Sequence, residues 1–340
     1  LSIKPKQVTK RLVSVLPERA RDVITKRYGL DSFDKMTLEA IGQKYNITRE
    51  RVRQIEKYSL ANILKSEVYK KEKEAFKELE GVLDSYGGLV PEVDFLDFIS
   101  DDKSVQNHVH FMLVLGEAFK KRKEDDDLKH RWYVDENLSK KIEDSLKKLY
   151  ENLPDDSLIP EGEMLKEFMN HLKDVSDKYK DEQVVKRWMS LSKRISKNPL
   201  GEWGATESPN VKAKGIRDYA YLVIRQHGSP MHFREVADRI SKLFEKRAHV
   251  ATCHNELIKD QRFVLVGRGL YALSEWGYKT GIVKEVIKEI LKKDGPLFKD
   301  EIIDKVLKER YVKPNTILVN LQDSKYFKKE KDGKYNIAKK

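Results

Sequence analysis

Four segments of the chain repeat one plan, and this repeat constrains the fold more than any other feature of the sequence. Each segment has an amphipathic helical pattern, a turn that contains a proline, a second helical pattern and a short extended stretch with an aromatic residue. The four prolines are 69, 70 and 66 residues apart; they are Pro91, Pro160, Pro230 and Pro296. The four aromatic residues are 71, 68 and 64 residues apart; they are Trp132, Trp203, Tyr271 and Tyr335. Because two independent landmarks keep nearly the same period, the sequence predicts a row of small, similar domains.

The extended stretches of the last two segments predict β-hairpins. RFVLVG and LYALS flank a Gly-containing turn in one segment, and YFKKE and KYNIA do so in the other. Three helices closed by such a hairpin form a winged helix. The first two segments have weaker hairpin patterns, so a purely helical array is the alternative for them. We predict a mainly α fold of tandem helix-turn-helix and winged-helix domains with small β-hairpin wings. The predicted domains are residues 1–66, 67–137, 138–212, 213–278 and 279–340.

The N-terminal segment has a different pattern, in which LPERARDVITKRYGL is followed by TLEAIGQKYNITRERVRQIEKYSLANIL. Gly29 is placed to end the first helix in the left-handed conformation, and Asn46 is placed to make a tight turn between the next two helices. Helical spacing turns Val52, Ile55 and Ser59 inward on the last helix. The side chains on its opposite face are Arg49, Glu50, Arg53 and Gln54. This is helix-turn-helix geometry, in which the start of the second helix enters the major groove.

These residues, 16–64, resemble region 4 of primary sigma factors, where a T-R-E-R-V-R-Q-I-E run forms the recognition helix. The resemblance implies base contacts in a promoter element by Arg49, Glu50, Arg53 and Gln54. Their chemistry agrees, because Arg pairs with guanine, Gln with adenine and Glu with cytosine. The side chains expected to contact phosphates are Thr37, Thr48, Arg51 and Lys57. The SLANIL ending lacks the basic residue usual in that family. No part of the chain resembles the sigma regions that bind core polymerase tightly.

The resemblance to region 4 also implies a protein partner. It implies contact with the β-flap of the RNA polymerase core, through an apolar face that includes Leu12, Val13 and Leu16. The predicted partners are therefore double-stranded DNA and the RNA polymerase core.

Residues 215–278 resemble the HARE-type winged helix, which also forms the N-terminal domain of the delta subunit of bacterial RNA polymerase. The match lies in GIRDYAYLVIRQHGSPMHFREVADRI and CHNELIKDQRFVLVGRGLYALSEWGY. Domains of this type contact proteins as well as DNA, so the fold alone does not decide the function. Possible secondary DNA contacts are His254, Asn255, Lys259, Arg262 and Arg268. Polar residues on or beside the third helix of the last segment are Lys313, Asn315, Asn320 and Lys325.

Composition is consistent with a nucleic-acid partner without requiring one. The formal net charge is +12, and 36% of the residues are charged. A basic chain suits a polyanion, because each neutralised phosphate releases counterions, but a lysine-rich solubilising surface has the same composition. No stretch approaches the roughly 18 apolar residues that a membrane span needs. We predict no membrane contact and a cytoplasmic, nucleoid-associated protein of bacterial type.

Motifs for catalysis or metal binding are weak. His108 and His110 lie two residues apart, which places them on different faces of a helix. Cys253 is the single cysteine, so it has no thiolate partner for a metal. The acidic run at 125–127 falls in a predicted wing, where a solvated loop is the simpler interpretation. We predict no enzyme, no catalytic residue, no metal and no cofactor.

These observations predict a DNA-binding transcription regulator or sigma-like factor that acts with bacterial RNA polymerase. One alternative is an interaction scaffold associated with the polymerase, in which the later winged helices hold proteins. A second alternative is a nucleoid protein or a reader of modified DNA.

Overall fold

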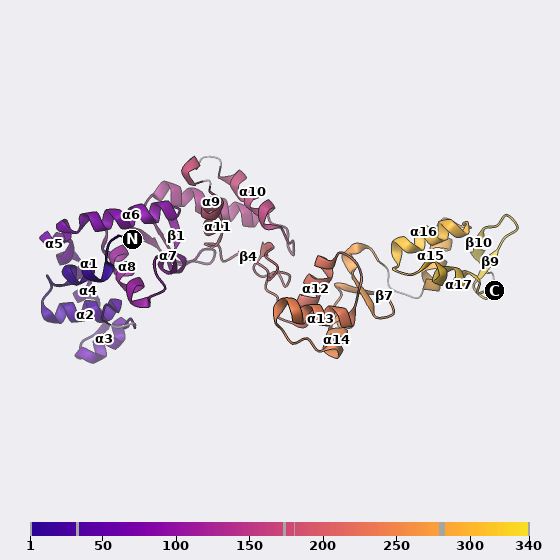
Figure 1. Ribbon diagram of the computed structural model, residues 1–340, viewed down its shortest axis with the longest axis horizontal. Coiled ribbons are helices and arrows are strands. Elements are labelled where there is room, and N and C mark those ends of the chain that lie inside the picture. Colours follow the sequence, from indigo (N-terminus) through magenta and orange to yellow (C-terminus); the bar gives the residue numbers. More distant parts are fainter. Residues whose placement is uncertain (1, 32–33, 173–174, 180, 279–282, 339–340) are drawn as a thin grey trace. The chain divides into compact units, whose positions relative to one another are not determined.

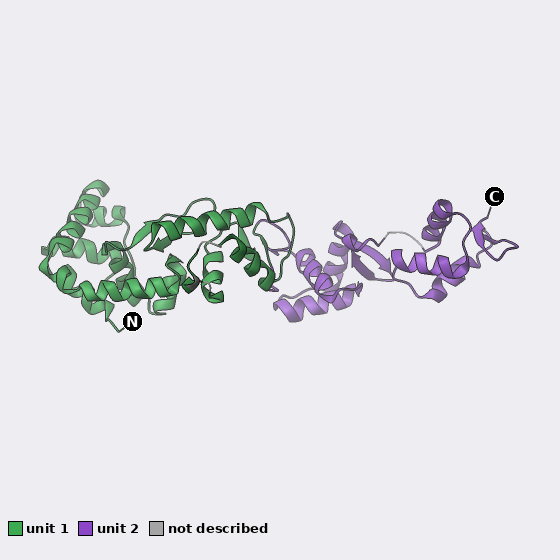
Figure 2. Ribbon diagram, turned by 90° about the horizontal axis from the view of Figure 1, so that it is seen from above, with its two compact units in different colours: residues 1–196, 203–206 green, residues 197–202, 207–340 purple. Residues whose placement is uncertain are grey.

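The computed structural model describes residues 2–31, 34–172, 175–179, 181–278 and 283–338. The chain forms two compact units, residues 1–196 with 203–206 and residues 197–202 with 207–340 (Figure 2). Each unit is described by itself. Within the described residues, no helix combines the length and the apolar character that crossing a membrane requires.

The first unit begins with the helices of the helix-turn-helix (Figure 1). They are α1 (Pro5–Val13), α2 (Glu18–Tyr28), α3 (Leu38–Tyr45), α4 (Arg49–Lys65) and the short α5 (Glu67–Lys71). Local chemistry sets their ends as the sequence predicts. Gly29 ends α2 in the left-handed conformation with φ 63°, and Asn46 turns the chain after α3 with φ 53°.

A winged helix follows in the same unit. Its elements are α6 (Lys73–Tyr86), β1 (Leu89–Pro91), α7 (Glu92–Ile99), α8 (Lys103–Leu115), β2 (Lys120–Arg122) and β3 (Arg131–Tyr133). The strands form an antiparallel sheet in the order β1-β3-β2, with Val90 opposite Trp132. The predicted aromatic landmark therefore lies in the central strand, where it is buried.

The next segment keeps the same order of elements. It contains α9 (Glu136–Glu151), α10 (Glu161–His171), a 3-10 turn (Asp177–Tyr179), α11 (Glu182–Met189), β4 (Ile195–Lys197) and β5 (Trp203–Ala205). A β-bridge between Ile159 and Trp203 takes the place of the first strand of the sheet. This minimal sheet needs few alternating apolar residues, which explains why the hairpin pattern of this segment is weak in the sequence.

The second unit contains two further copies of the plan. The first consists of α12 (Ile216–His227), β6 (Met231–His232), α13 (Phe233–Phe244), α14 (Val250–Lys259), β7 (Phe263–Gly267), β8 (Leu270–Leu273) and a 3-10 turn (Ser274–Trp276). The second consists of α15 (Val283–Asp294), α16 (Lys299–Glu309), α17 (Pro314–Leu321), β9 (Phe327–Lys329) and β10 (Tyr335–Ile337). The predicted fold class is confirmed, because the described residues are mostly helical with small antiparallel hairpins. The five domain boundaries remain a prediction.

The N-terminal helices contribute to two separate cores. Val23, Ile41 and Val52 are fully buried in a small core between α2, α3 and α4. Leu12 and Leu16 belong instead to a larger core that continues into α6, α7 and α8. This corrects one expectation, since the apolar face of Leu12, Val13 and Leu16 is covered by residues of this chain. Their exposed fractions are 0%, 7% and 2%.

Candidate nucleic-acid interface

Helix α4 presents the predicted base-reading residues on one exposed face. Val52 and Ser59 are buried on its inner side, which fixes the rotation of the helix against α2 and α3. The hydroxyl of Thr48 accepts a hydrogen bond from the backbone N–H of Arg51 at 3.2 Å and caps the first turn. The structure therefore places four exposed polar side chains together on the outer face; they are Arg49, Glu50, Arg53 and Gln54.

Two of these side chains form a bidentate ion pair. Arg53 Nε and Nη2 donate to the two carboxylate oxygens of Glu50 at 2.8 and 2.7 Å. The hydrogen bond from Arg53 lowers the pKa of the Glu50 carboxyl. Both side chains remain more than half exposed on the outer face of α4.

A second pair joins a predicted phosphate contact to a predicted base contact. Arg51 Nη1 donates to Gln54 Oε1 at 3.1 Å, and both side chains are exposed. Tyr58, which was not among the predicted contacts, lies one turn beyond Gln54 and is 70% exposed. The signal that could have found it is an aromatic residue at i+4 spacing on an otherwise polar helix face.

The remaining predicted phosphate contacts lie at helix starts or on the same outer face. The hydroxyl of Thr37 accepts from the backbone N–H of Ala40 at 3.1 Å, as Thr48 does for α4. Each hydroxyl keeps its own hydrogen for donation, at a helix N-terminus that favours an anion. Lys57 is exposed one turn after Arg53. Groups of the kind that bind phosphate thus lie at the starts of α3 and α4 and beside the predicted base contacts on α4.

In the second unit, α14 and the β7–β8 turn carry most of the predicted secondary contacts. Asn255 and Lys259 are exposed on α14, and Arg268 is exposed in the turn. His254 is half-buried, because its ring stacks on Phe233 with 4.2 Å between the ring centroids. Its packing places the imidazole beside the hydrophobic core of the domain.

Arg262 has a structural role that the sequence analysis did not anticipate. Its guanidinium donates to Asp218 Oδ1 at 2.9 Å, to Asp260 Oδ2 at 2.7 Å and to the side chain of Asn210 at 3.1 Å. Burial by itself would raise the pKa of Asp218, but the backbone N–H of Gly215 and the Arg262 guanidinium outweigh it and hold this pKa below its usual range. These internal partners, and not a DNA groove, surround the arginine.

Replacing Arg262 by alanine is expected to lower the free energy of unfolding of this domain by about 2 to 4 kcal/mol, because Asp218 then stays buried without its cation. The loss should be largest at neutral pH. Since the folded state lowers the pKa of Asp218, the stabilisation is present above the unfolded pKa and disappears as the pH falls through the folded value. Calorimetric melting of the full chain from pH 7 to pH 3 measures this. Arg268→Ala, at an exposed turn, is the matched control; an equal effect of both variants would contradict the structural role.

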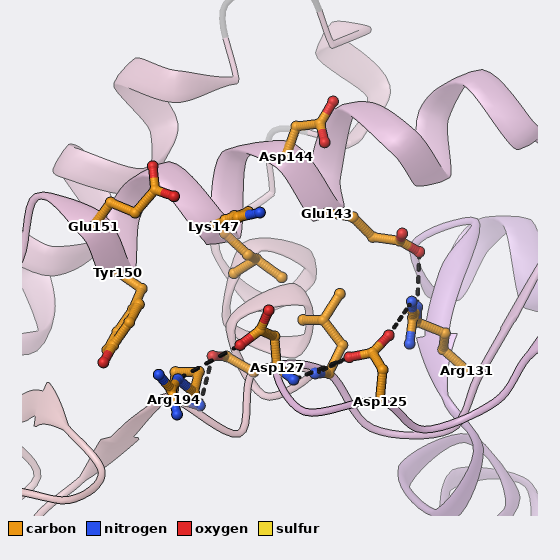
Figure 3. Close-up of a pocket in the computed structure, with 12 residues that line it drawn as sticks. Asp125, Asp127, Arg131, Glu143, Asp144, Lys147, Tyr150, Glu151 and Arg194 are labelled. Carbon is orange, nitrogen blue, oxygen red and sulfur yellow. Dashed lines mark hydrogen bonds and ion pairs between the residues drawn. The ribbon is translucent and has the colours of Figure 1, made fainter.

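One pocket lies away from α4, between α9 and the β2–β3 loop (Figure 3). It has a volume of about 390 Å³. Arg131 pairs with Asp125 at 3.1 Å, and Arg194 pairs with Asp127 at 3.5 Å. Two of the three carboxylates of the acidic run at 125–127 are thus in ion pairs with arginines. Among the described residues, no group of three or more metal-ligating side chains is present.

Cys253 is buried on the inner side of α14, and burial raises the pKa of its thiol to about 11. A thiol of that kind stays protonated and is a poor nucleophile.

Comparison with known proteins agrees with this geometry at the N-terminus. The family model described as Sigma-70, region 4 matches residues 12–64. RNA polymerase sigma factor SigA1 of Synechococcus elongatus is 52% identical over 52 residues, which are 15% of this chain and 13% of the relative. The principal sigma factor HrdD of Streptomyces coelicolor is 41% identical over 54 residues, 16% of each chain. Sigma factor RpoD of Neisseria gonorrhoeae is 39% identical over 57 residues, 17% of this chain and 9% of the relative. The chain thus spans a small part of the length of these relatives.

Proposed function

We propose that this chain, whose residues 12–64 are a sigma-70 region 4 domain, is a DNA-binding transcription factor that acts with bacterial RNA polymerase. The observation that carries the proposal is the outer face of α4, where Arg49, Glu50, Arg53 and Gln54 are exposed on a helix fixed from behind. The major groove of DNA admits an α-helix, and these side chains supply donors and acceptors that can pair with base edges there. We also propose that the protein is cytoplasmic and associated with the nucleoid.

The side chains of the domain divide into two roles. Arg49, Glu50, Arg53 and Gln54 read base edges, because they are exposed in the N-terminal part of α4, the part of a recognition helix that enters the major groove. Thr37, Thr48, Arg51 and Lys57 bind phosphates and set the register of the helix in the groove. Glu50 pre-positions Arg53, so the arginine loses little conformational freedom when it meets a guanine.

RNA polymerase is the second proposed partner. The relatives are named as RNA polymerase sigma factors, and the resemblance implies that the β-flap is the part of the polymerase that is contacted. A contact through Leu12, Val13 and Leu16 requires that these buried side chains first be uncovered.

We propose that residues 215–278 of the second unit form a HARE-type winged helix. This domain would add a further contact. Asn255, Lys259 and Arg268 are free to reach a phosphate backbone. Ile258 on the same helix is 62% exposed. A protein-holding role of this domain is compatible with DNA reading by α4.

The phosphate contacts give a test of DNA binding by salt dependence. Replacing Arg51 or Lys57 by alanine should weaken binding about equally on the preferred duplex and on a random duplex, because phosphates carry no sequence information. Each variant should also reduce the log–log salt slope by about 0.9, the contribution of one neutralised phosphate. Fluorescence anisotropy of the full chain across a salt series measures both, on a duplex selected from a randomised pool. Lys103→Ala, an exposed lysine on α8, is the control. Slopes unchanged in both variants would contradict the assigned roles.

A further inference from the structure

The third helix of each winged-helix copy differs in what lies against it. In the first copy, α8 is buried along most of its length and packs on α1, α2 and α7. In the second copy, α11 packs on β1 of the first copy. Its Trp188 Nε1 donates to the carbonyl oxygen of Gly87 at 3.1 Å, and its Arg187 Nη1 donates to that of Tyr86 at 3.1 Å. Contacts within the chain therefore occupy both of these helices.

Helix α17 (Figure 1) is the third helix of the last copy, and it keeps an exposed outer side. Ile317 and Leu321 are 0% and 2% exposed in a core shared with α15 and α16, which fixes the rotation of the helix. Helical spacing turns the opposite side outward. We define the α17 face as Asn315, Val319 and Gln322, which are all exposed there. Val319 is 67% exposed, so the core leaves this face open to a ligand.

The surroundings of the α17 face are basic. No Asp or Glu occurs between Arg310 and Gln322. Exposed lysines come before the helix, after it and in the β9–β10 hairpin; they are Lys313, Lys325, Lys328, Lys329 and Lys331. Residues 327–337, which form the hairpin, hold four lysines and two acidic residues. A polyanion is therefore the partner whose charge complements this surface.

The α17 face itself carries no charge, because the residues from Pro314 to Gln322 are all uncharged. Double-stranded DNA fits an uncharged face within a basic rim. The amides of Asn315 and Gln322 can pair with adenine, and the methyl groups of Val319 can contact the methyl group of thymine. The lysines of the rim can bind phosphates. An acidic protein surface would instead place carboxylates against Val319, where α17 has no cation to pair with them.

We propose that α17 and the β9–β10 hairpin form a second site for double-stranded DNA, separate from α4. Helix α17 enters the major groove with Asn315, Val319 and Gln322 against base edges, and the lysines of the rim bind the phosphates on either side. This site goes beyond the proposed function, which needs only α4. The four copies thereby divide into two whose third helix packs within the chain, α8 and α11, and a last one whose third helix binds DNA.

A thiol at position 319 tests the second site in the full chain. Val319→Cys places a thiol on the α17 face, whereas the native thiol of Cys253 is buried and should label slowly. A random-sequence duplex should slow labelling at position 319 about tenfold when about nine-tenths of the sites are occupied, because only unoccupied sites react. Lys292→Cys, at an exposed position on α15, is the matched control and should label at the same rate with and without duplex.

Failure of the second site and failure of the proposed function can be told apart. An Arg53→Ala background should keep the protection at position 319, because α17 belongs to the other compact unit. An unprotected position 319 in a chain that still binds duplex, or equal protection at positions 319 and 292, would overturn the second site and leave DNA reading by α4 standing. Equal protection by polyglutamate would overturn DNA as the ligand in favour of an acidic protein. A chain that binds no duplex would overturn both.

Salt dependence gives an independent measurement on the full chain. Lys313→Ala combined with Lys328→Ala should reduce the log–log salt slope on a random duplex by about 0.9 for each lysine that neutralises a phosphate. Lys292→Ala should leave the slope unchanged. A double variant with the slope of the unaltered chain would overturn phosphate binding by the rim of the α17 face.

Discussion

Replacing Gly42 by alanine is expected to weaken DNA binding by the N-terminal domain severely. A Cβ atom at this position would lie 2.6 Å from the backbone carbonyl oxygen of Ile47, a distance that real Cβ atoms do not tolerate. The backbone N–H of Ile47 donates to the carbonyl of Gly42 at 2.9 Å, so the turn is tied to α3 at the same point. Because the obstacle is backbone and not a flexible side chain, α4 must move relative to α3, and the recognition face moves with it.

We expect Gly42→Ala to weaken binding to the preferred duplex by about a hundredfold or more, because the exposed face of α4 is displaced. The melting temperature of this domain should also fall, since overpacking costs about 1–3 kcal/mol. Gly81→Ala is the matched control. It also lies inside a helix, and an added Cβ there meets nothing within 4 Å. Its stability should be unchanged or slightly higher, because alanine favours a helix more than glycine does. Wild-type DNA binding by Gly42→Ala would contradict the close packing of α3 and α4.

Replacing Arg53 by alanine is expected to weaken binding to the preferred duplex about tenfold to a hundredfold, with a much smaller effect on random DNA. The physical reason is that its guanidinium is exposed on the outer face of α4, where it forms a bidentate pair with Glu50. A guanine that loses its bidentate partner is left with two unpaired acceptors in the groove. Gln54→Ala should behave in the same way at an adenine, and Arg51 would lose its hydrogen-bond partner.

Competition titrations on both duplexes at one salt concentration measure this selectivity. Arg51→Ala is the control, because it lies on the same helix and is expected to weaken both duplexes equally. If Arg53→Ala and Arg51→Ala cannot be distinguished on the two duplexes, α4 does not read bases, and the protein-scaffold function gains support.

The sequence was sufficient for features whose causes are local. The caps at Thr37 and Thr48, the left-handed residues Gly29 and Asn46, and the inward side of α4 all follow from helix chemistry and spacing. The period of the repeat also predicted the order of elements, because each copy needs the same amphipathic helices and the same small hairpin to close its core. Because helical spacing sets the inward side of α4, it also sets the opposite, exposed side, which carries the predicted base contacts.

Features that depend on distant partners were not predictable from pattern. Leu12 and Leu16 have the spacing of a binding face, and only the packing of α8, about 90 residues away, shows that they are covered. Arg262 has the position of a groove contact, but Asp218, 44 residues earlier, holds its guanidinium. A single sequence shows which side of a helix is apolar or charged, and it does not show which other segment lies against that side.

The central claim is that Arg53 on α4 reads a specific base pair, and a protein–DNA double-mutant analysis tests it most directly. The full chain, Arg53→Ala and Arg51→Ala are each titrated against the preferred duplex and against duplexes with one base pair changed. The account predicts one position at which the change weakens the unaltered chain and Arg51→Ala by about tenfold or more and has no effect on Arg53→Ala. The same profile of penalties in all three proteins would contradict it.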